Sequence, residues 1–105
     1  EYFKNTNGGK LSTLSEEIKH ATDVIQKINT NTRSLNSIAN KQKMLSLNAS
    51  IEAARSGEAG VGFAVVAKSM GDLSSQSATI YSDIEKSVVE ITSTIEKLAS
   101  LFEEE

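Results

Sequence analysis

A repeat of seven residues runs through most of the chain and constrains its fold more than any other feature. Between residues 11 and 56, apolar or small side chains recur at alternating intervals of three and four. They are Leu11, Leu14, Ile18, Ala21, Ile25, Ile28, Thr32, Leu35, Ala39, Gln42, Ser46, Ala49, Ala53 and Ser56. A second run with the same alternation comprises Phe63, Val66, Met70, Leu73, Ser77, Ile80, Ile84, Ser87, Ile91, Thr94, Leu98 and Leu101. This spacing is typical of coiled coils and predicts two long helices that supercoil left-handed around their partners.

Three glycines separate the two runs: Gly57, Gly60 and Gly62. Glycine permits positive φ and ends a helix without the steric cost of a Cβ. We therefore predict an all-α fold, a long antiparallel coiled-coil helical hairpin. Its first helix should cover about residues 10–56, its turn about 57–62 and its second helix about 63–102. Residues 1–9 contain a Gly-Gly pair after an Asn/Thr cluster, and we expect a flexible lead or the boundary of a cloned fragment there.

Two helices alone bury only one narrow stripe on each of them. Most of the stability of long helices in water comes from packing against other elements, so this hairpin needs a further partner. The sequence accordingly predicts a homodimer, in which two hairpins form a four-helix bundle with both turns at one end.

Composition and charge disfavour several classes of function. The 11 basic and 14 acidic residues are dispersed, so no clustered basic face for nucleic acid is expected. No run approaches the roughly 18 apolar residues that a membrane span needs, and we expect no direct membrane contact. The chain has no Cys and one histidine, His20, and it contains no nucleophile–base pair or phosphate-binding loop. We therefore predict no metal, no cofactor and no catalytic residue, hence no enzyme, and the lack of cysteine agrees with a cytoplasmic location.

The middle of the chain is more specific than a coiled coil requires. Residues 38–77 read IANKQKMLSLNASIEAARSGEAGVGFAVVAKSMGDLSSQS. The core LNASIEAARSGEAGVGFAVVA resembles the hairpin tip of the methyl-accepting chemotaxis proteins, the bacterial chemoreceptors. The resemblance implies a cytoplasmic, membrane-distal tip of a dimeric bundle that forms trimers of dimers. It also implies binding and regulation of a CheA-type histidine kinase through a CheW-type coupling adaptor.

The resemblance also assigns partner-binding positions. Those for contact between dimers are Met44, Leu47, Asn48, Ile51, Glu52 and Arg55. Glu58, Phe63 and Val65 correspond to the surface that meets the adaptor and the kinase. Glu52 and Arg55 are three residues apart and can pair within one helix or across an interface. Plainer alternatives remain: a solvated surface pair worth less than about 1 kcal/mol, Leu47 and Ile51 as core residues, and Phe63 as a plug at the bundle end.

Several residues depart from the family pattern. Asn40 stands where the family often has Phe, and losing that ring removes roughly 1.5–3 kcal/mol of burial from the trimer of dimers. Val61 replaces the usual Arg of the turn, and Ser69-Met70-Gly71 stands where the family carries Glu-Val-Arg. Gly71 also costs a helix about 1 kcal/mol relative to Ala and indicates a soft spot. The alternative to a kinase-controlling tip is thus a divergent, receptor-derived coiled-coil dimerisation module without kinase control.

Overall fold

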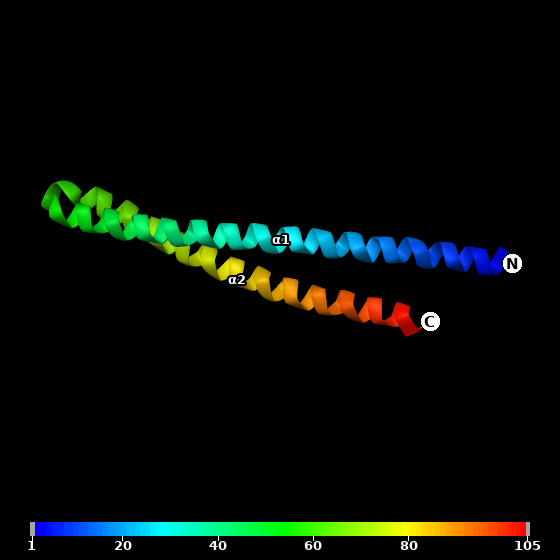
Figure 1. Cartoon of the computed structure of the whole chain (residues 1–105). Coiled ribbons are helices and arrows are strands. Elements are labelled where there is room, and N and C mark those ends of the chain that lie inside the picture. Colours follow the sequence, from blue (N-terminus) through cyan, green and yellow to red (C-terminus); the bar gives the residue numbers. More distant parts are fainter. Residues whose placement is uncertain (1, 105) are drawn as a thin grey trace. The chain divides into compact units, whose positions relative to one another are not determined.

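The computed structural model describes the backbone of residues 2–104 and the side chains of residues 9–101. Its elements in chain order are helix α1 (Tyr2–Arg55), the short 3-10 helix η1 (Gly57–Gly60) and helix α2 (Val61–Glu104) (Figure 1). No strand occurs in this described part of the chain. The predicted all-α helical hairpin is therefore confirmed.

The N-terminal segment falls partly outside this description. Glu1 is not described, and neither are the side chains of residues 2–8. The backbone of the proposed lead, residues 1–9, belongs to α1 from Tyr2 onwards. Whether this lead is flexible in solution stays a prediction, as do the expected helix limits.

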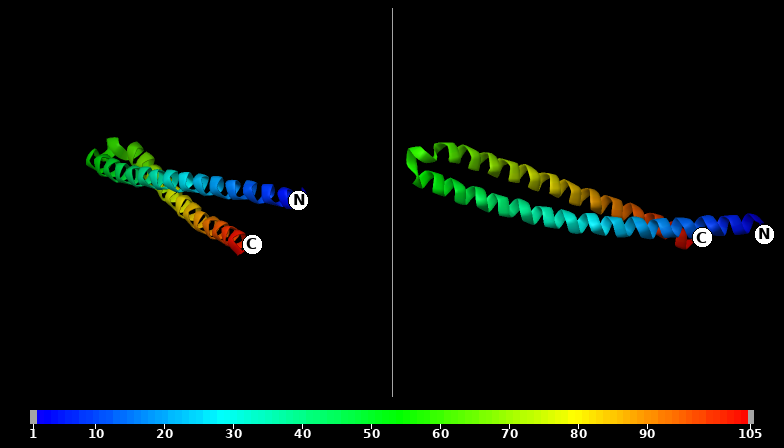
Figure 2. Two further views of the ribbon diagram at one scale, coloured as in Figure 1. Left: turned by 45° about the vertical axis from the view of Figure 1, so that its right-hand side comes forward. Right: turned by 90° about the horizontal axis from the view of Figure 1, so that it is seen from above.

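By their internal packing, the residues form two units. One unit, Asn31–Ile84, contains η1 and the parts of α1 and α2 next to it, and we call it the turn unit. The other combines Glu1–Thr30 with Glu85–Glu105, and we call it the terminal unit. Within the turn unit, α1 and α2 run antiparallel on either side of η1, as both views of Figure 2 show.

The turn unit buries a stripe of small residues at seven-residue intervals. They are Thr32, Ala39, Ser46 and Ala53, then Gly60, Ala67 and Ser74. The four residues of α1 belong to the seam expected from the sequence. Because none of these side chains is large, the helix backbones lie close together along this stripe.

In α2 the surface that is buried differs from the seam expected from the sequence. Of that seam, Met70, Ser77 and Ile84 are half-buried. Val66 and Leu73 are more than half exposed, and the fully buried residues are instead the ones that follow them, Ala67 and Ser74. The seven-residue repeat of α2 is present as predicted. The stripe that faces α1, however, lies one residue later along the chain than the predicted seam, at Ala67 and Ser74.

The terminal unit is built from larger side chains that are less completely covered. Ile18 and Ile25 of α1 are half-buried, as are Val88 and Ile95 of α2. They continue the seven-residue spacing of the buried stripe. No described residue of this unit is fully buried.

Candidate protein-interaction surface

The reversal of the chain depends on two glycines with different tasks. After α1 ends at Arg55, Gly57 adopts a φ of 61°, the left-handed region that favours glycine. Gly60 is buried, and a Cβ at this position would overlap the backbone carbonyl of Ala53. Gly62 lies in the first turn of α2, where an added Cβ would meet nothing within 4 Å. The structure thus gives a steric reason for the first two glycines and none for the third.

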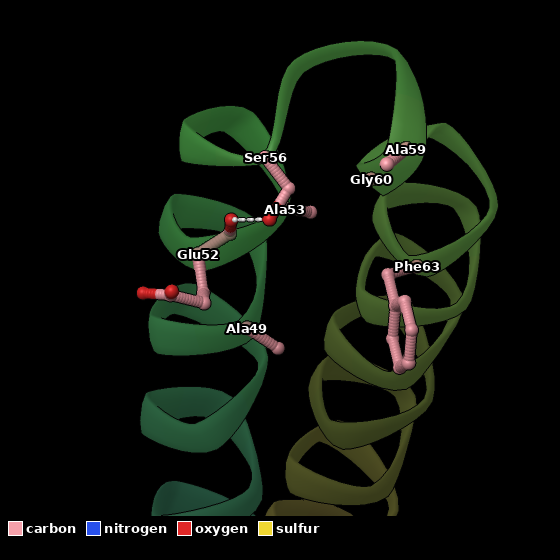
Figure 3. Close-up of a pocket in the computed structure, with 7 residues that line it drawn as sticks. All are labelled: Ala49, Glu52, Ala53, Ser56, Ala59, Gly60 and Phe63. Carbon is pink, nitrogen blue, oxygen red and sulfur yellow. Dashed lines mark hydrogen bonds between the residues drawn. The ribbon is translucent and has the colours of Figure 1, made fainter.

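A hollow of about 360 Å³ opens beside the turn. It is lined by Ala49, Glu52, Ala53, Ser56, Ala59, Gly60 and Phe63. In Figure 3 the Phe63 ring lies along α2, whereas the Glu52 carboxylate points away from α2. The Ser56 hydroxyl donates to the backbone carbonyl of Glu52 at 3.1 Å, which secures the last turn of α1. The hollow is therefore apolar in its floor, and Glu52 forms part of its rim.

Three large apolar residues form a stripe along α1. Met44, Leu47 and Ile51 are separated by three and four residues, so they lie along one side of the helix. Each is more than half exposed, and Met44 reaches 64%. The alternative that Leu47 and Ile51 are core residues of this hairpin is therefore wrong. Their proposed role in contact between dimers stays a prediction.

Glu52 and Arg55 form an ion pair within α1. The Arg55 Nη1 donates to the Glu52 Oε2 at 3.3 Å. The side chains are 69% and 74% exposed, so water screens the attraction and the pair contributes less than about 1 kcal/mol to folding. As an exposed acid–base pair beside the hollow, it remains available for recognition by another molecule.

The other residues assigned by resemblance are also exposed, but they do not gather in one cluster. Asn48 lies on α1 and Glu58 in η1. Val65 and Phe63 lie on α2, and Phe63 is 74% exposed. In this chain Phe63 therefore does not plug the end of its own hairpin. The nine positions surround the turn on several sides, and the structure brings only Glu52 and Phe63 to the same hollow.

The structure also reveals an apolar side that sequence reasoning recognised only in part. Leu73 and Ile80 of α2, and Ile38 and Leu45 of α1, are between 53% and 61% exposed. Each stands at the position directly before the buried or half-buried stripe. In an antiparallel pair of right-handed helices, these positions fall on the same side of the pair. The available signal was the recurrence of an apolar residue immediately before a small seam residue, as in Ile38-Ala39.

Neither a metal-binding cluster nor a membrane-spanning helix is found in the part of the chain that the structure describes. Within it, no three His, Cys, Asp or Glu side chains come together as a metal ion would require. Among the same residues, neither helix has a stretch apolar enough to cross a membrane.

Comparison with known proteins identifies the family. Residues 4–105 match the family model of the methyl-accepting chemotaxis protein (MCP) signalling domain. The chain is 35% identical to the methyl-accepting chemotaxis protein McpB of Bacillus subtilis (strain 168), over 97% of this chain and 16% of the relative. It is 43% identical to the aerotaxis receptor of Escherichia coli (strain K12), over 75% of this chain and 16% of the relative. The chain thus spans only a small part of the length of these relatives. The resemblance seen in residues 38–77 is confirmed. This chain belongs to the family of methyl-accepting chemotaxis protein signalling domains.

Proposed function

We propose that this chain is a cytoplasmic chemoreceptor signalling tip, which acts as a homodimer and regulates a CheA-type histidine kinase through a CheW-type adaptor. Membership of the signalling-domain family supports a role in chemotactic signal transduction. In this proposal the chain acts by binding and by changes in helix packing, and it catalyses no reaction.

The observation that carries the proposal is the exposed apolar side of the turn unit. Side chains such as Leu73 and Ile80 are only partly covered in the hairpin, because more than half of each faces solvent. Complete burial of such a side chain contributes about 1.5–3 kcal/mol. A contiguous set on both helices is what a second hairpin would cover in a four-helix bundle. The buried stripe faces α1 or α2 of the same chain, which leaves this side for the partner.

The surface around the turn supports the binding of further proteins. Met44, Leu47 and Ile51 offer apolar area, and Arg55 offers a planar guanidinium that suits a carboxylate. An apolar centre with a charged rim is common at protein interfaces. The hollow beside Phe63 is on the apolar side rather than on this stripe. Glu52 lines this hollow and also pairs with Arg55, so the two surfaces adjoin at the Glu52 carboxylate.

The departures from the family pattern concern the binding of partners at the tip. Asn40, Val61 and Ser69 are all exposed, so their side chains are available to any partner at the tip. Without the larger or charged groups expected there, a trimer of dimers is disfavoured while the dimer is unaffected. A dimerisation module without kinase control is the second candidate, and the same apolar side favours it.

Capture of the adaptor and kinase from the same organism by the purified chain separates the two candidates. We expect the unmodified chain to retain both proteins. The double variant Glu52→Ala, Arg55→Ala should retain them at least tenfold less well. Its control is Glu96→Ala, Lys97→Ala, which removes the same two charges from exposed positions in the terminal unit.

The expected result requires that the control binds like the unmodified chain. Failure of the unmodified chain to retain either protein, with its dimer intact by sedimentation, would leave the dimerisation module as the function. Equal binding by both double variants would remove Glu52 and Arg55 from the proposed surface.

A further inference from the structure

Gly71 is an unusual residue in the middle of α2. Among the common residues, only proline has a lower helix propensity than glycine, so glycine is normally disfavoured in the interior of a helix. Its backbone does not adopt a positive φ, so no turn requires glycine here. The residue is half-buried and faces into the turn unit. The reason for a glycine at this position therefore lies in its surroundings.

The neighbour that Gly71 accommodates is Ser46 of α1. A Cβ built on Gly71 would lie 2.7 Å from the Ser46 Oγ and 3.7 Å from the Ser46 Cβ. Ser46 is only 6% exposed, so the space around its hydroxyl is restricted. The hydrogen of glycine at position 71 thus leaves room for the Ser46 hydroxyl.

A second serine connects to the same place in α2. The Ser74 hydroxyl donates to the Gly71 carbonyl at 3.0 Å, and Ser74 is 2% exposed. A hydroxyl that bonds back to a carbonyl in the preceding turn commonly bends a helix slightly. Gly71 therefore makes two contacts: its lack of a side chain leaves space for Ser46 of α1, and its carbonyl accepts the hydrogen bond from Ser74.

We propose that Gly71 and Ser46 form a fitted contact that sets the spacing between α1 and α2 in the turn unit. The Ser74 hydroxyl, bonded to the Gly71 carbonyl, places a local bend of α2 at this contact. Gly71 is then a positioning residue, rather than the soft spot that the sequence alone indicates. The inference concerns the hairpin itself and goes beyond kinase binding, since it does not depend on the identity of any partner.

Gly62 provides a matched control in the same helix. A Cβ added to Gly62 would meet nothing within 4 Å, and Gly62 is exposed. Gly62→Ala should therefore show only the gain in helix propensity, a rise of a few degrees, about 4 °C, in the unfolding midpoint. Gly71→Ala has at least the same intrinsic gain in helix propensity, because Gly71 lies in the helix interior, but its Cβ meets the Ser46 hydroxyl. We expect its midpoint to stay unchanged or to fall.

The decisive comparison repeats Gly71→Ala in a Ser46→Ala background. With the hydroxyl absent, the added Cβ keeps only the 3.7 Å contact with the Cβ of residue 46, an ordinary distance. In this background, Gly71→Ala should raise the midpoint as Gly62→Ala does. All variants are compared at one protein concentration, because association changes the apparent stability. If Gly71→Ala raises the midpoint equally in both backgrounds, the fitted contact does not exist.

A distance measurement tests the spacing independently of stability. The chain has no native cysteine, so nitroxide labels can be attached to Lys41→Cys and Gln76→Cys, two exposed positions on opposite helices. An excess of unlabelled chain ensures that each measured pair lies within one molecule. Gly71→Leu should lengthen this distance, whereas Gly62→Leu should leave it unchanged. Identical distance distributions for the two variants would overturn the proposal.

Discussion

The turn unit and the terminal unit of this hairpin differ in the size and in the burial of the side chains that lie between their helices. In the turn unit, the fully buried part of the stripe between the helices consists of residues no larger than Thr, whereas Tyr81, farther from the turn, is half-buried. In the terminal unit, the corresponding positions hold Ile and Val, and these remain half-covered. The complete burial of the stripe residues in the turn unit is therefore due to the close approach of the two helix backbones, and not to a core of large apolar side chains.

The turn unit buries only small apolar side chains and leaves large ones exposed. The fully buried hydrophobic residues of the described chain are Ala39, Ala53 and Ala67, whose side chains are single methyl groups. Larger apolar residues of the turn unit, such as Met44, Leu73 and Phe63, face outwards. The turn unit thus leaves much of its large apolar side-chain area exposed, and this is the area that the proposed partners would cover.

The largest effect should come from placing charges on the apolar side of the turn unit. Leu73→Asp together with Ile80→Asp would put two carboxylates per chain into the proposed dimer interface, where desolvation is costly. We expect the dimer dissociation constant to rise at least about 100-fold, equivalent to about 2.7 kcal/mol. Sedimentation equilibrium measures this change.

The matched control for this variant is Ser82→Asp with Val89→Asp. It has two carboxylates at the same seven-residue interval, one residue after the half-buried Tyr81 and Val88 and thus on the opposite side of α2. Its dissociation constant should change little. Equal weakening by the two double variants would show that general charge repulsion, and not this apolar side, governs association.

A second variant tests whether the stripe of the turn unit is as tightly packed as its burial indicates. Ala67 is 1% exposed, and Ala67→Leu would force a larger side chain between close backbones. We expect a loss of about 1–3 kcal/mol in the free energy of unfolding. Denaturant titration provides the measurement, and Ala64→Leu, at an exposed position of the same helix, is the control. A stable Ala67→Leu chain would mean that the helices separate easily.

A smaller loss is expected in the terminal unit. Ile25 is half-buried, so Ile25→Ala should cost about 1–2 kcal/mol, below the 2–5 kcal/mol typical of a fully buried isoleucine. Gln26→Ala, an exposed neighbour, should have almost no effect in the same titration. A cost for Ile25 in the full-burial range would indicate that this seam is more completely covered in solution, and would weaken the contrast between the units.

The smallest effect should come from the exposed ion pair. Glu52→Ala with Arg55→Ala should change the free energy of unfolding by less than about 1 kcal/mol, because both side chains are mostly in water. That difference should shrink further when thermal unfolding is repeated at high salt. A larger and salt-independent loss would assign the pair a structural role in addition to the proposed role in binding.

Some of this architecture follows directly from the order of residues. The seven-residue repeat fixed the two helices, and the glycines fixed the reversal between them. Thr32, Ala39, Ser46 and Ala53 were all expected in the seam, and all are buried. Such features are local or periodic, so one chain read in isolation is sufficient to find them.

Other features depend on what lies opposite a residue, and a periodic pattern does not contain that information. In α2 the apolar residues mark the side proposed for a second hairpin. The periodic pattern therefore predicts a seam at Val66 and Leu73, whereas Ala67 and Ser74 face α1. The sequence alone predicts a soft spot at Gly71, because its neighbour Ser46 is 25 positions away in the chain. The exposure of the Met44–Leu47–Ile51 stripe likewise became clear only with the fold.

The close fit of Gly60 against the Ala53 carbonyl also bears on whether a hairpin closes on itself or exchanges a helix with a second chain. Two long helices joined by a short connection can exchange arms with a second chain if the connection straightens into a continuous rod. The left-handed Gly57 and the close fit of Gly60 make the sharp reversal free of steric cost, so each chain can close on itself. A side chain at position 60 would remove this advantage and favour exchange. Gly57 and Gly60 thus favour the pairing of α1 and α2 within one chain over exchange with a second chain.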